Sequence, residues 1–419
     1  MDYRSAARKL PEATGGEKRK YYAMKSADKL DAPDESVSMG TKRMVAVMIG
    51  YVGTGYYGLQ IQEGPDGLPT IEGEVFKALV AAGAVSEENA VSVHKIKWSR
   101  TARTDKGVHA LRNILACKLV LSEDLVAAVN AHLPPAVRMF GYARTTKSFN
   151  AKNACCARTY NYVIPVSAFR PLGSAEEVKA RWSAAEQGEL PAALQWEGEW
   201  EFSDSTLALI NDTLAGFVGF HKFHNYSSGI KFGQHQSTRN IISFTAAAPT
   251  VVNGVPVVVA TVHGESFVYN QIRKMIGAML AVVTARGPPS LLALSFKDHS
   301  IRVPLAPGEF LHLERCHFDH YHETLVGHPR LDFDDCDSAV EEFRANFIHP
   351  AMVQSAPVME QFMTEMEDMF DEVAALARQE EAKDVKRATM ARSVRLEPFE
   401  YLPSGDKARL RAEIELWSE

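Results

Sequence analysis

One carboxylate stands among many cations in the segment 94–112, which reads HKIKWSRTARTDKGVHALR. Asp105 is its only acid, and the basic side chains around it are Lys95, Lys97, Arg100, Arg103, Lys106 and Arg112. Neighbouring positive charges favour the ionised form of a carboxyl group, so we expect the pKa of Asp105 to be depressed. An ionised carboxylate can act as a nucleophile or a general base, and the surrounding cations suit phosphate groups.

The residues Asp105-Lys106-Gly107 have the composition of a turn, which places this carboxylate on a loop. The alternative is a surface turn in which Asp105 only caps its own backbone. Composition alone does not separate these two interpretations.

A second charged residue of interest lies in a long apolar segment. Residues 266–286 predict a buried helix, because their apolar side chains point in nearly every direction around its axis. Arg273 stands in the middle of this helix, and a buried guanidinium needs a carboxylate or phosphate partner. The alternative is that Arg273 reaches the edge of the helix and extends into solvent.

Aromatic side chains accompany both charged segments. Tyr160 follows Arg158 on a predicted strand over 158–165, where its ring could pack in the core or form a platform for a nucleobase. The run Phe220-His221-Lys222-Phe223-His224-Asn225-Tyr226 interleaves rings with His, Lys and Asn and resembles an RNA contact surface. By itself this second signal is weak.

The run Gly53-Thr54-Gly55-Tyr56-Tyr57-Gly58 matches the G-x-G-x-x-G pattern of dinucleotide-binding proteins. A helix should open at the third glycine of that motif to receive the pyrophosphate, but residues 60–70 with two prolines intervene here. A nicotinamide- or flavin-dependent oxidoreductase is therefore a weak alternative.

The net charge of −6 divides unevenly along the chain of 419 residues. Residues 319–372 carry fourteen acids and two bases, and residues 373–419 carry nine of each, which leaves a net charge of +6 on residues 1–318. A basic body is compatible with a polyanionic ligand. The five cysteines are odd in number and lack a C-x-x-C spacing, so we expect neither a disulfide framework nor a zinc site. No apolar run is long enough for a membrane-spanning helix or a secretory signal.

The order of elements predicts α/β or α+β units. Expected strands cover 44–49, 110–121, 158–165, 238–247 and 255–263, and expected helices cover 71–84, 123–132 with Ser122 as N-cap, 204–215 and 266–286. Residues 1–42 predict a disordered tail, and 170–203 an insertion or loop. Past residue 318, a Met/Phe stripe from Met359 to Phe370 predicts an amphipathic helical extension that packs on the body.

The motif around Asp105, ARTDKGVHA, resembles the signature of the TruA family of tRNA pseudouridine synthases. Residues 51–58, 157–162 and 266–273 resemble the family's first loop, tyrosine strand and arginine helix, and the resemblance covers about 43–318. The lysine after the aspartate and the run Phe223–Tyr226 are similar to the eukaryotic branch that acts on many tRNA positions. The family's Phe-His-Ala-Arg stretch appears as Phe149-Asn150-Ala151-Lys152, so an RNA contact there is left open.

The resemblance implies a two-domain α+β fold with a mainly antiparallel central sheet flanked by helices, an active-site cleft between domains and a helical C-terminal extension. The implied domains are 43–165 and 166–318, followed by an acidic extension and tail over 319–419. It implies that Asp105 is the catalytic carboxylate, that Arg273 pairs with it and that Tyr160 stacks on the base. The implied substrate-binding residues are Arg103, Lys106, His109, Arg158, Phe223, His224 and Asn225.

The reaction that the resemblance implies needs no cofactor or metal, and its substrate is tRNA, in the anticodon stem and loop, with other RNAs left open. We expect a monomer, with a homodimer left open, and the nucleus ahead of the mitochondrion or cytoplasm. The second functional hypothesis is a catalytically inactive relative that only binds RNA.

Overall fold

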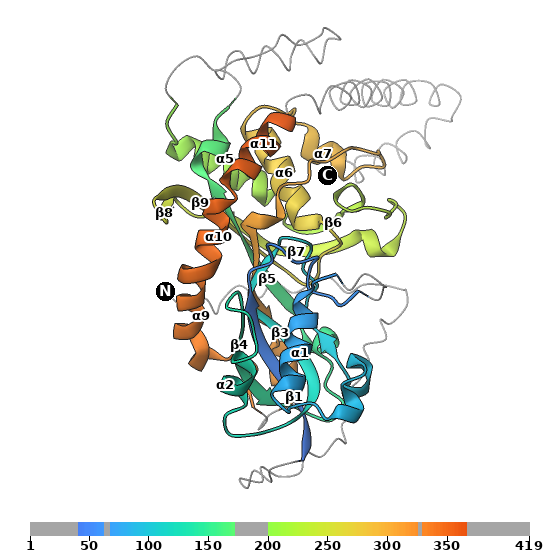
Figure 1. The fold of residues 1–419 in the computed structure, drawn as a ribbon. Coiled ribbons are helices and arrows are strands. Elements are labelled where there is room, and N and C mark those ends of the chain that lie inside the picture. The colour runs from blue at the N-terminus through green and yellow to red at the C-terminus, as the bar shows by residue number, and fades with distance from the viewer. Residues whose placement is uncertain (1–40, 63–67, 172–199, 326–328, 367–419) are drawn as a thin grey trace, which may run out of the picture.

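The computed structural model describes residues 41–62, 68–171, 200–325 and 329–366. Its centre is a ten-stranded sheet with the order β4-β1-β3-β10-β5-β9-β7-β6, in which β2 also pairs with β3 and β8 with β9 (Figure 1). The strands are β1 Lys42–Tyr51, β2 Ser99–Arg100, β3 His109–Val120, β4 Val137–Arg144, β5 Ala157–Pro165, β6 Gly219–Lys222, β7 Thr238–Ala246, β8 Thr250–Val252, β9 Val255–Gly264 and β10 Leu311–His317. This mixed, mainly antiparallel sheet confirms the α+β class.

Strand β10 joins the two halves of the sheet. It pairs in parallel with β3, where His312 lies beside His109, and antiparallel with β5, where Leu311 lies opposite Tyr162. Every other pairing among the described strands is antiparallel. Because one sheet runs through both predicted domains, the division at residue 165 stays a prediction.

Helices cover the sheet, and their bounds agree with most of the expected segments. They are α1 Ile71–Ala81, α2 Leu125–Asn130, α3 Ala151–Ala154, α5 Asp204–Ala215, α6 Gln271–Val283, α7 Leu291–Ser295, α8 Asp319–Thr324, α9 Asp337–Phe343, α10 His349–Gln354 and α11 Ala356–Glu365. Helix α5 has the predicted bounds, with Ser203 accepting a hydrogen bond from the Thr206 amide at its start.

Two helix starts differ from the sequence prediction. Helix α2 has Asp124 at its N-cap position and no side-chain cap, so the predicted cap at Ser122 is wrong. Helix α6 begins only at Gln271, because Asn270 adopts a left-handed backbone with φ of 67° and interrupts the helical path. The predicted insertion over 170–203 and the tail over 1–42 lie almost wholly outside the described residues.

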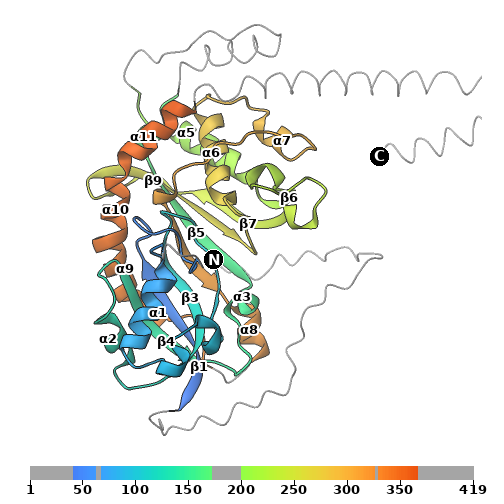
Figure 2. The same ribbon diagram turned by 45° about the vertical axis from the view of Figure 1, so that its right-hand side comes forward.

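The acidic extension packs along one side of the sheet, where α9, α10 and α11 follow one another past both halves (Figure 2). Met359, Met363 and Met366 are buried, which confirms the predicted packing role of the methionine stripe within the described part of it. Residues 367–372 of the acidic segment lie outside that part.

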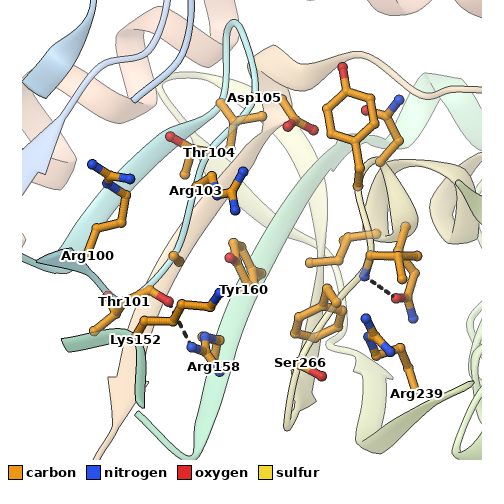
Figure 3. Close-up of a pocket in the computed structure, with 18 of the residues that line it drawn as sticks. Arg100, Thr101, Arg103, Thr104, Asp105, Lys152, Arg158, Tyr160, Arg239 and Ser266 are labelled. Atoms are coloured by element: carbon orange, nitrogen blue, oxygen red, sulfur yellow. Dashed lines mark hydrogen bonds between the residues drawn. The ribbon is translucent and has the colours of Figure 1, made fainter. Parts of the chain in front are cut away.

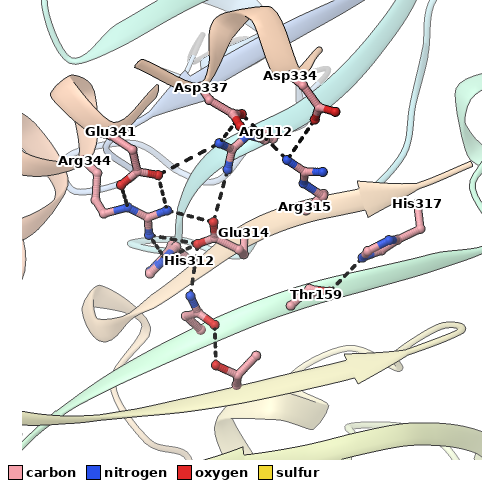
Figure 4. A network of polar contacts seen from close by, with 12 residues as sticks. Arg112, Thr159, His312, Glu314, Arg315, His317, Asp334, Asp337, Glu341 and Arg344 are labelled. Carbon is pink, nitrogen blue, oxygen red and sulfur yellow. Dashed lines mark hydrogen bonds and ion pairs between the residues drawn. The ribbon is translucent and has the colours of Figure 1, made fainter. Parts of the chain in front are cut away.

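An ion-pair network fixes this extension to the sheet (Figure 4). Glu314 on β10 lies 3.2 Å from Arg112 on β3 and 2.7 Å from Arg344, which follows α9. Arg112 also reaches Asp337 at 2.8 Å. Although burial opposes its ionisation, hydrogen bonds from His312 and Arg344 hold the pKa of the Glu314 carboxyl well below its usual range. Ion pairs therefore join the extension to the sheet, in which Asp337 and Arg344 of the extension meet Arg112 and Glu314 of the sheet.

Within the described residues, no helix has the length and apolarity that crossing a bilayer requires. The same part of the chain contains no group of three or more acidic, histidine or cysteine side chains arranged to hold a metal ion.

We expect Glu314→Gln to lower the free energy of unfolding at pH 7 by about 1.5–3 kcal/mol, because Arg112 and Arg344 lose their shared carboxylate but keep Asp337 and Glu341 as partners. Glu314 has a depressed pKa in the folded state, so its stabilisation is present above the usual value of 4.5 and is lost as pH falls below it. Denaturant titrations at pH 7 and pH 4 should show the difference shrinking. The control is Glu342→Gln on the exposed side of α9, and an equal loss in both variants would contradict the prediction.

Candidate active site

Asp105 lies on a tight turn between β2 and β3. The Val108 amide donates to the Asp105 carbonyl at 3.1 Å, and Gly107 has a φ of +83° that favours glycine. The predicted turn at this position is confirmed. We call residues 104–108 the Asp105 loop.

Two glycines of the first loop pack directly against the backbone of the Asp105 loop. A Cβ on Gly53 would lie 2.1 Å from the Val108 carbonyl oxygen, and one on Gly58 would lie 2.9 Å from that of Thr104. The glycines of the G-x-G-x-x-G run therefore permit backbone contact within the protein. Because these glycines contact protein backbone and the next helix begins only at Ile71, the structure does not support the dinucleotide interpretation.

Buried hydrogen bonds fix the same loop from below. The Tyr51 hydroxyl lies 2.8 Å from the Thr104 hydroxyl and accepts from the Asn113 amide at 3.1 Å. The Asn113 amide also donates to the Ala102 carbonyl at 3.2 Å. Because every partner is buried, these contacts leave the backbone around Asp105 little freedom.

His109 is a structural residue in this structure. The Gly53 amide donates to its Nδ1 at 3.0 Å, so the proton sits on Nε2, which donates to the Glu309 carbonyl at 2.8 Å. Burial lowers its pKa to about 4, so the ring is neutral at physiological pH. Since it has no exposed surface, its predicted contact with substrate is not supported.

The Asp105 side chain is half-buried, and its pKa differs from the sequence prediction. Burial raises the pKa of this carboxyl above its ordinary value of 3.8, and the Arg273 guanidinium opposes that rise. The expectation of a depressed pKa is wrong for this structure, because loss of hydration outweighs the cation's effect.

Arg273 lies under the Asp105 loop without touching the carboxylate. Its Nε donates to the Ala306 carbonyl at 2.6 Å. A Cβ added to Gly308 would lie 3.7 Å from the Arg273 guanidinium carbon and 2.9 Å from the Lys106 carbonyl oxygen. Both atoms therefore lie against the same side of this glycine. No ion pair of 4.0 Å or less joins the Arg273 guanidinium to the Asp105 carboxylate. The two residues lie near each other, but the predicted ion pair is not formed in this structure.

A cavity of about 810 Å³ opens beside Asp105, lined by residues from both halves of the sheet. Figure 3 shows Arg103, Lys152, Arg158 and Tyr160 along one wall, with Arg239 on the other. The basic residues among its described lining are Arg100, Arg103, Lys152, Arg158, Arg239 and Arg273, and Asp105 is the only acid there. A cavity with one carboxylate and many cations suits a polyanionic substrate.

Tyr160 and Arg158 lie in this cavity, as the sequence predicts. Tyr160 is 7% exposed and its ring meets that of Phe267 edge to face, with the centroids 5.4 Å apart. Burial raises the pKa of its phenol far above the usual value, so the hydroxyl keeps its proton. Arg158 donates to the carbonyls of Thr101 and Glu265, at 2.8 Å and 2.7 Å, and thereby ties β5 to both walls.

Three predicted contact residues lie elsewhere. Phe223, His224 and Asn225 are buried, and the Asn225 amide bonds to the Ser295 and His299 carbonyls at 2.8 Å and 2.9 Å. They fix α7 and the segment after it, and they do not line the cavity. Arg112, also counted among the cations near Asp105, points to the opposite face of the sheet and pairs with Glu314.

Sequence reasoning missed Arg239 and Tyr269. Arg239 follows Thr238 at the start of β7, and its buried Nε has no hydrogen-bond partner. A lone basic residue at a strand start carries no signal of its own. Tyr269 is 62% exposed, lies just before α6 and lines the cavity. The predicted helix began at residue 266, so this tyrosine was treated as part of a buried segment. Lys152, in the stretch whose role was left open, does line the cavity.

Comparisons with known proteins point to one family. A family model described as tRNA pseudouridine synthase matches residues 214–319. The Mus musculus protein named Pseudouridylate synthase 1 homolog is 35% identical over 317 residues, which cover 75% of this chain and 70% of that protein. The Yarrowia lipolytica protein named tRNA pseudouridine synthase 1 is 32% identical, covering 74% and 70%. The Saccharomyces cerevisiae protein named tRNA pseudouridine(27/28) synthase is 32% identical, covering 67% and 85%.

Replacing Arg273 with Met should raise the pKa of Asp105 further, because the cation that opposes the effect of burial is lost. Arg273→Lys keeps the charge and should leave the pKa nearer its value in the unaltered protein. A titration of the carbon-13-labelled aspartate carboxyl groups by NMR would measure both. If the Met variant titrates at the same pH as the unaltered protein, Arg273 does not act on this carboxylate.

Proposed function

This chain belongs to the TruA family of tRNA pseudouridine synthases, and we propose that it isomerises uridine in tRNA with Asp105 as the catalytic carboxylate. The observation that carries the proposal is a single half-buried carboxylate in a cavity whose other charged lining residues are all cations. Such a cavity attracts the RNA backbone and presents one anionic oxygen to the nucleotide that enters.

The reaction breaks the bond from ribose C1′ to uracil N1 and the C5–H bond, and it forms a bond from C1′ to C5 and an N1–H bond. No net oxidation occurs, so this chemistry requires no redox partner. Asp105 either attacks C1′ or takes a proton from C2′, and both routes need it ionised. The Arg273 guanidinium favours that ionised form against the effect of burial. Closing the short gap between the two groups around the substrate would strengthen this effect.

We assign Tyr160 a stacking role beneath the uracil. Its ring is fixed edge to face against Phe267 and lines the cavity near Asp105. Because burial raises its pKa, a phenolate that could remove the C5 proton is scarce at neutral pH. The neutral phenol can instead donate a hydrogen bond while its ring supports the base.

We assign phosphate contacts to the cations that surround the carboxylate. Arg103 is exposed at the mouth of the cavity, and Lys152 and Arg239 face each other across it (Figure 3). Arg239 is half-buried and lines the cavity, so its guanidinium can offer a charged donor to a phosphate oxygen there. A uridine in a stem must be extruded first, at a cost of a few kcal/mol, and these contacts would offset it.

The finer features of the substrate are also proposals. The yeast relative is named for positions 27 and 28 of tRNA, so we propose the anticodon stem as the target region. A monomer is sufficient, since both walls of the cavity come from one chain. The basic run Lys18-Arg19-Lys20 supports the nucleus as the compartment.

Asp105→Asn should lower the rate of pseudouridine formation by at least about 10²-fold, because the amide keeps the shape of the side chain but removes its basic oxygen. RNA affinity should be retained, since a negative charge is lost from a cationic cavity. Pseudouridine mapping and filter binding on one tRNA would measure the two quantities. The matched control is Asp124→Asn on the surface of α2. Unchanged pseudouridine formation in Asp105→Asn would show that Asp105 is not the catalytic carboxylate. RNA binding without any pseudouridine formation by the unaltered protein would support the inactive RNA-binding alternative.

Arg239→Gln should weaken RNA binding and reduce the slope of log affinity against log salt by about 1, because one phosphate contact is lost. The maximal rate should change little, as the residue lies across the cavity from Asp105. Binding isotherms at several salt concentrations would test this, with Arg302→Gln as an exposed control outside the cavity. An unaltered slope would show that Arg239 meets no phosphate.

A further inference from the structure

A second cavity of about 820 Å³ lies on the other side of the Asp105 loop. It shares part of its wall with the first cavity, through Arg100, Arg103, Thr104, Asp105 and Tyr269. The two spaces are therefore neighbours separated by the loop that carries the carboxylate. A strand that places one nucleotide in the first cavity can therefore bring an adjacent nucleotide to this shared wall.

Tyr57 presents an aromatic ring to the second cavity. The ring is 43% exposed, although the backbone that carries it is held firmly. The Tyr57 amide donates to the Pro69 carbonyl at 2.9 Å, and its carbonyl accepts from the Gln62 side chain at 3.0 Å. The next residue, Gly58, has a φ of +88° and packs on the Thr104 backbone. A large apolar surface on a rigid support is pre-organised for stacking.

The polar groups around this ring suit a nucleotide. The Lys106 ammonium lies 4.9 Å from the centre of the Tyr57 ring, and Tyr269 forms a second exposed ring at the shared wall. Gln60 and Gln62 add amide groups that can pair with base edges. Among the described lining residues, Asp105 is the only carboxylate. Rings, amides and cations together are the groups that bind single-stranded RNA.

The cation–π contact of Lys106 does not prevent a base from stacking on the Tyr57 ring. Lys106 is an exposed side chain, and a cation–π contact at an exposed site is weaker than the stacking of a base on an aromatic ring. A phosphate that enters beside the ring offers the ammonium a stronger partner. Binding of a nucleotide would therefore exchange the cation–π contact for a stacked base and a phosphate contact.

We propose that the second cavity binds the base of the nucleotide next to the target uridine, stacked on Tyr57, with Lys106 at the phosphate between them. This inference rests on the proposed function. It makes the loop 57–62 a specificity-determining part of the site, because the cavity reads a neighbour of the uridine that reacts.

The test combines a protein variant with a matched change in the RNA. Tyr57→Ala and the unaltered protein are each assayed on an anticodon-arm RNA, and on two versions that carry an abasic ribose on the 5′ or the 3′ side of the target. On intact RNA, Tyr57→Ala should lower kcat/KM about fivefold or more. On one of the two abasic RNAs, kcat/KM of the unaltered protein should fall by the same factor. On that RNA, kcat/KM of Tyr57→Ala should fall no further than it does on intact RNA.

Two control variants accompany this cycle. Tyr57→Phe keeps the ring and should behave as the unaltered protein does. Val251→Ala removes a 66% exposed apolar side chain outside both cavities and should leave all rates unchanged.

An equal loss for Tyr57→Ala on intact and on both abasic RNAs would overturn the proposal, because the ring would then act independently of a neighbouring base. If Tyr57→Ala fails to fold, the assays of the unaltered protein still test the proposal. An unchanged kcat/KM on both abasic RNAs would overturn it. Failure of the proposed function looks different: the unaltered protein would form no pseudouridine on intact RNA.

Discussion

The site depends on close backbone contact around the Asp105 loop. Gly53 and Gly58 approach the Val108 and Thr104 carbonyl oxygens so closely that any Cβ would collide with them. The buried pair Tyr51–Thr104 fixes the same loop from the sheet side. The catalytic role proposed for Asp105 would need this precision, because small errors of position reduce rates strongly. Glycine is therefore needed here for access of backbone to backbone rather than for flexibility.

Burial and charge oppose each other at Asp105, and burial is the stronger influence in the free protein. Arg273 lies under the loop but is held by the Ala306 carbonyl without closing on the carboxylate. RNA phosphates would partly neutralise the other cations of the cavity, which leaves Arg273 as the cation directed at Asp105. In this structure the two charged groups therefore lie near each other without forming an ion pair.

Local features could be predicted from the sequence, while features that depend on distant contacts could not. The turn at Asp105, the bounds of α5 and the strand with Tyr160 follow from short-range patterns, and all three agree with the structure. The sequence could not separate Arg112, which faces the extension, from Arg103, which faces the cavity, because that choice depends on strand direction and register. The raised pKa of Asp105 was equally hidden, because burial is a property of the folded chain.

The two opposite charge patterns of the chain serve opposite faces of one sheet. On the outer side, Asp337 and Glu314 neutralise Arg112, and Arg344 completes the network. On the cavity side, six cations line the space around Asp105. The described lining residues include no acid other than Asp105. A net charge of −6 is therefore compatible with the proposed RNA binding, because Asp105 is the only acid among the described residues that line the cavity. Moving the acids of the outer side to the cavity face would leave the net charge unchanged and remove the attraction for phosphate.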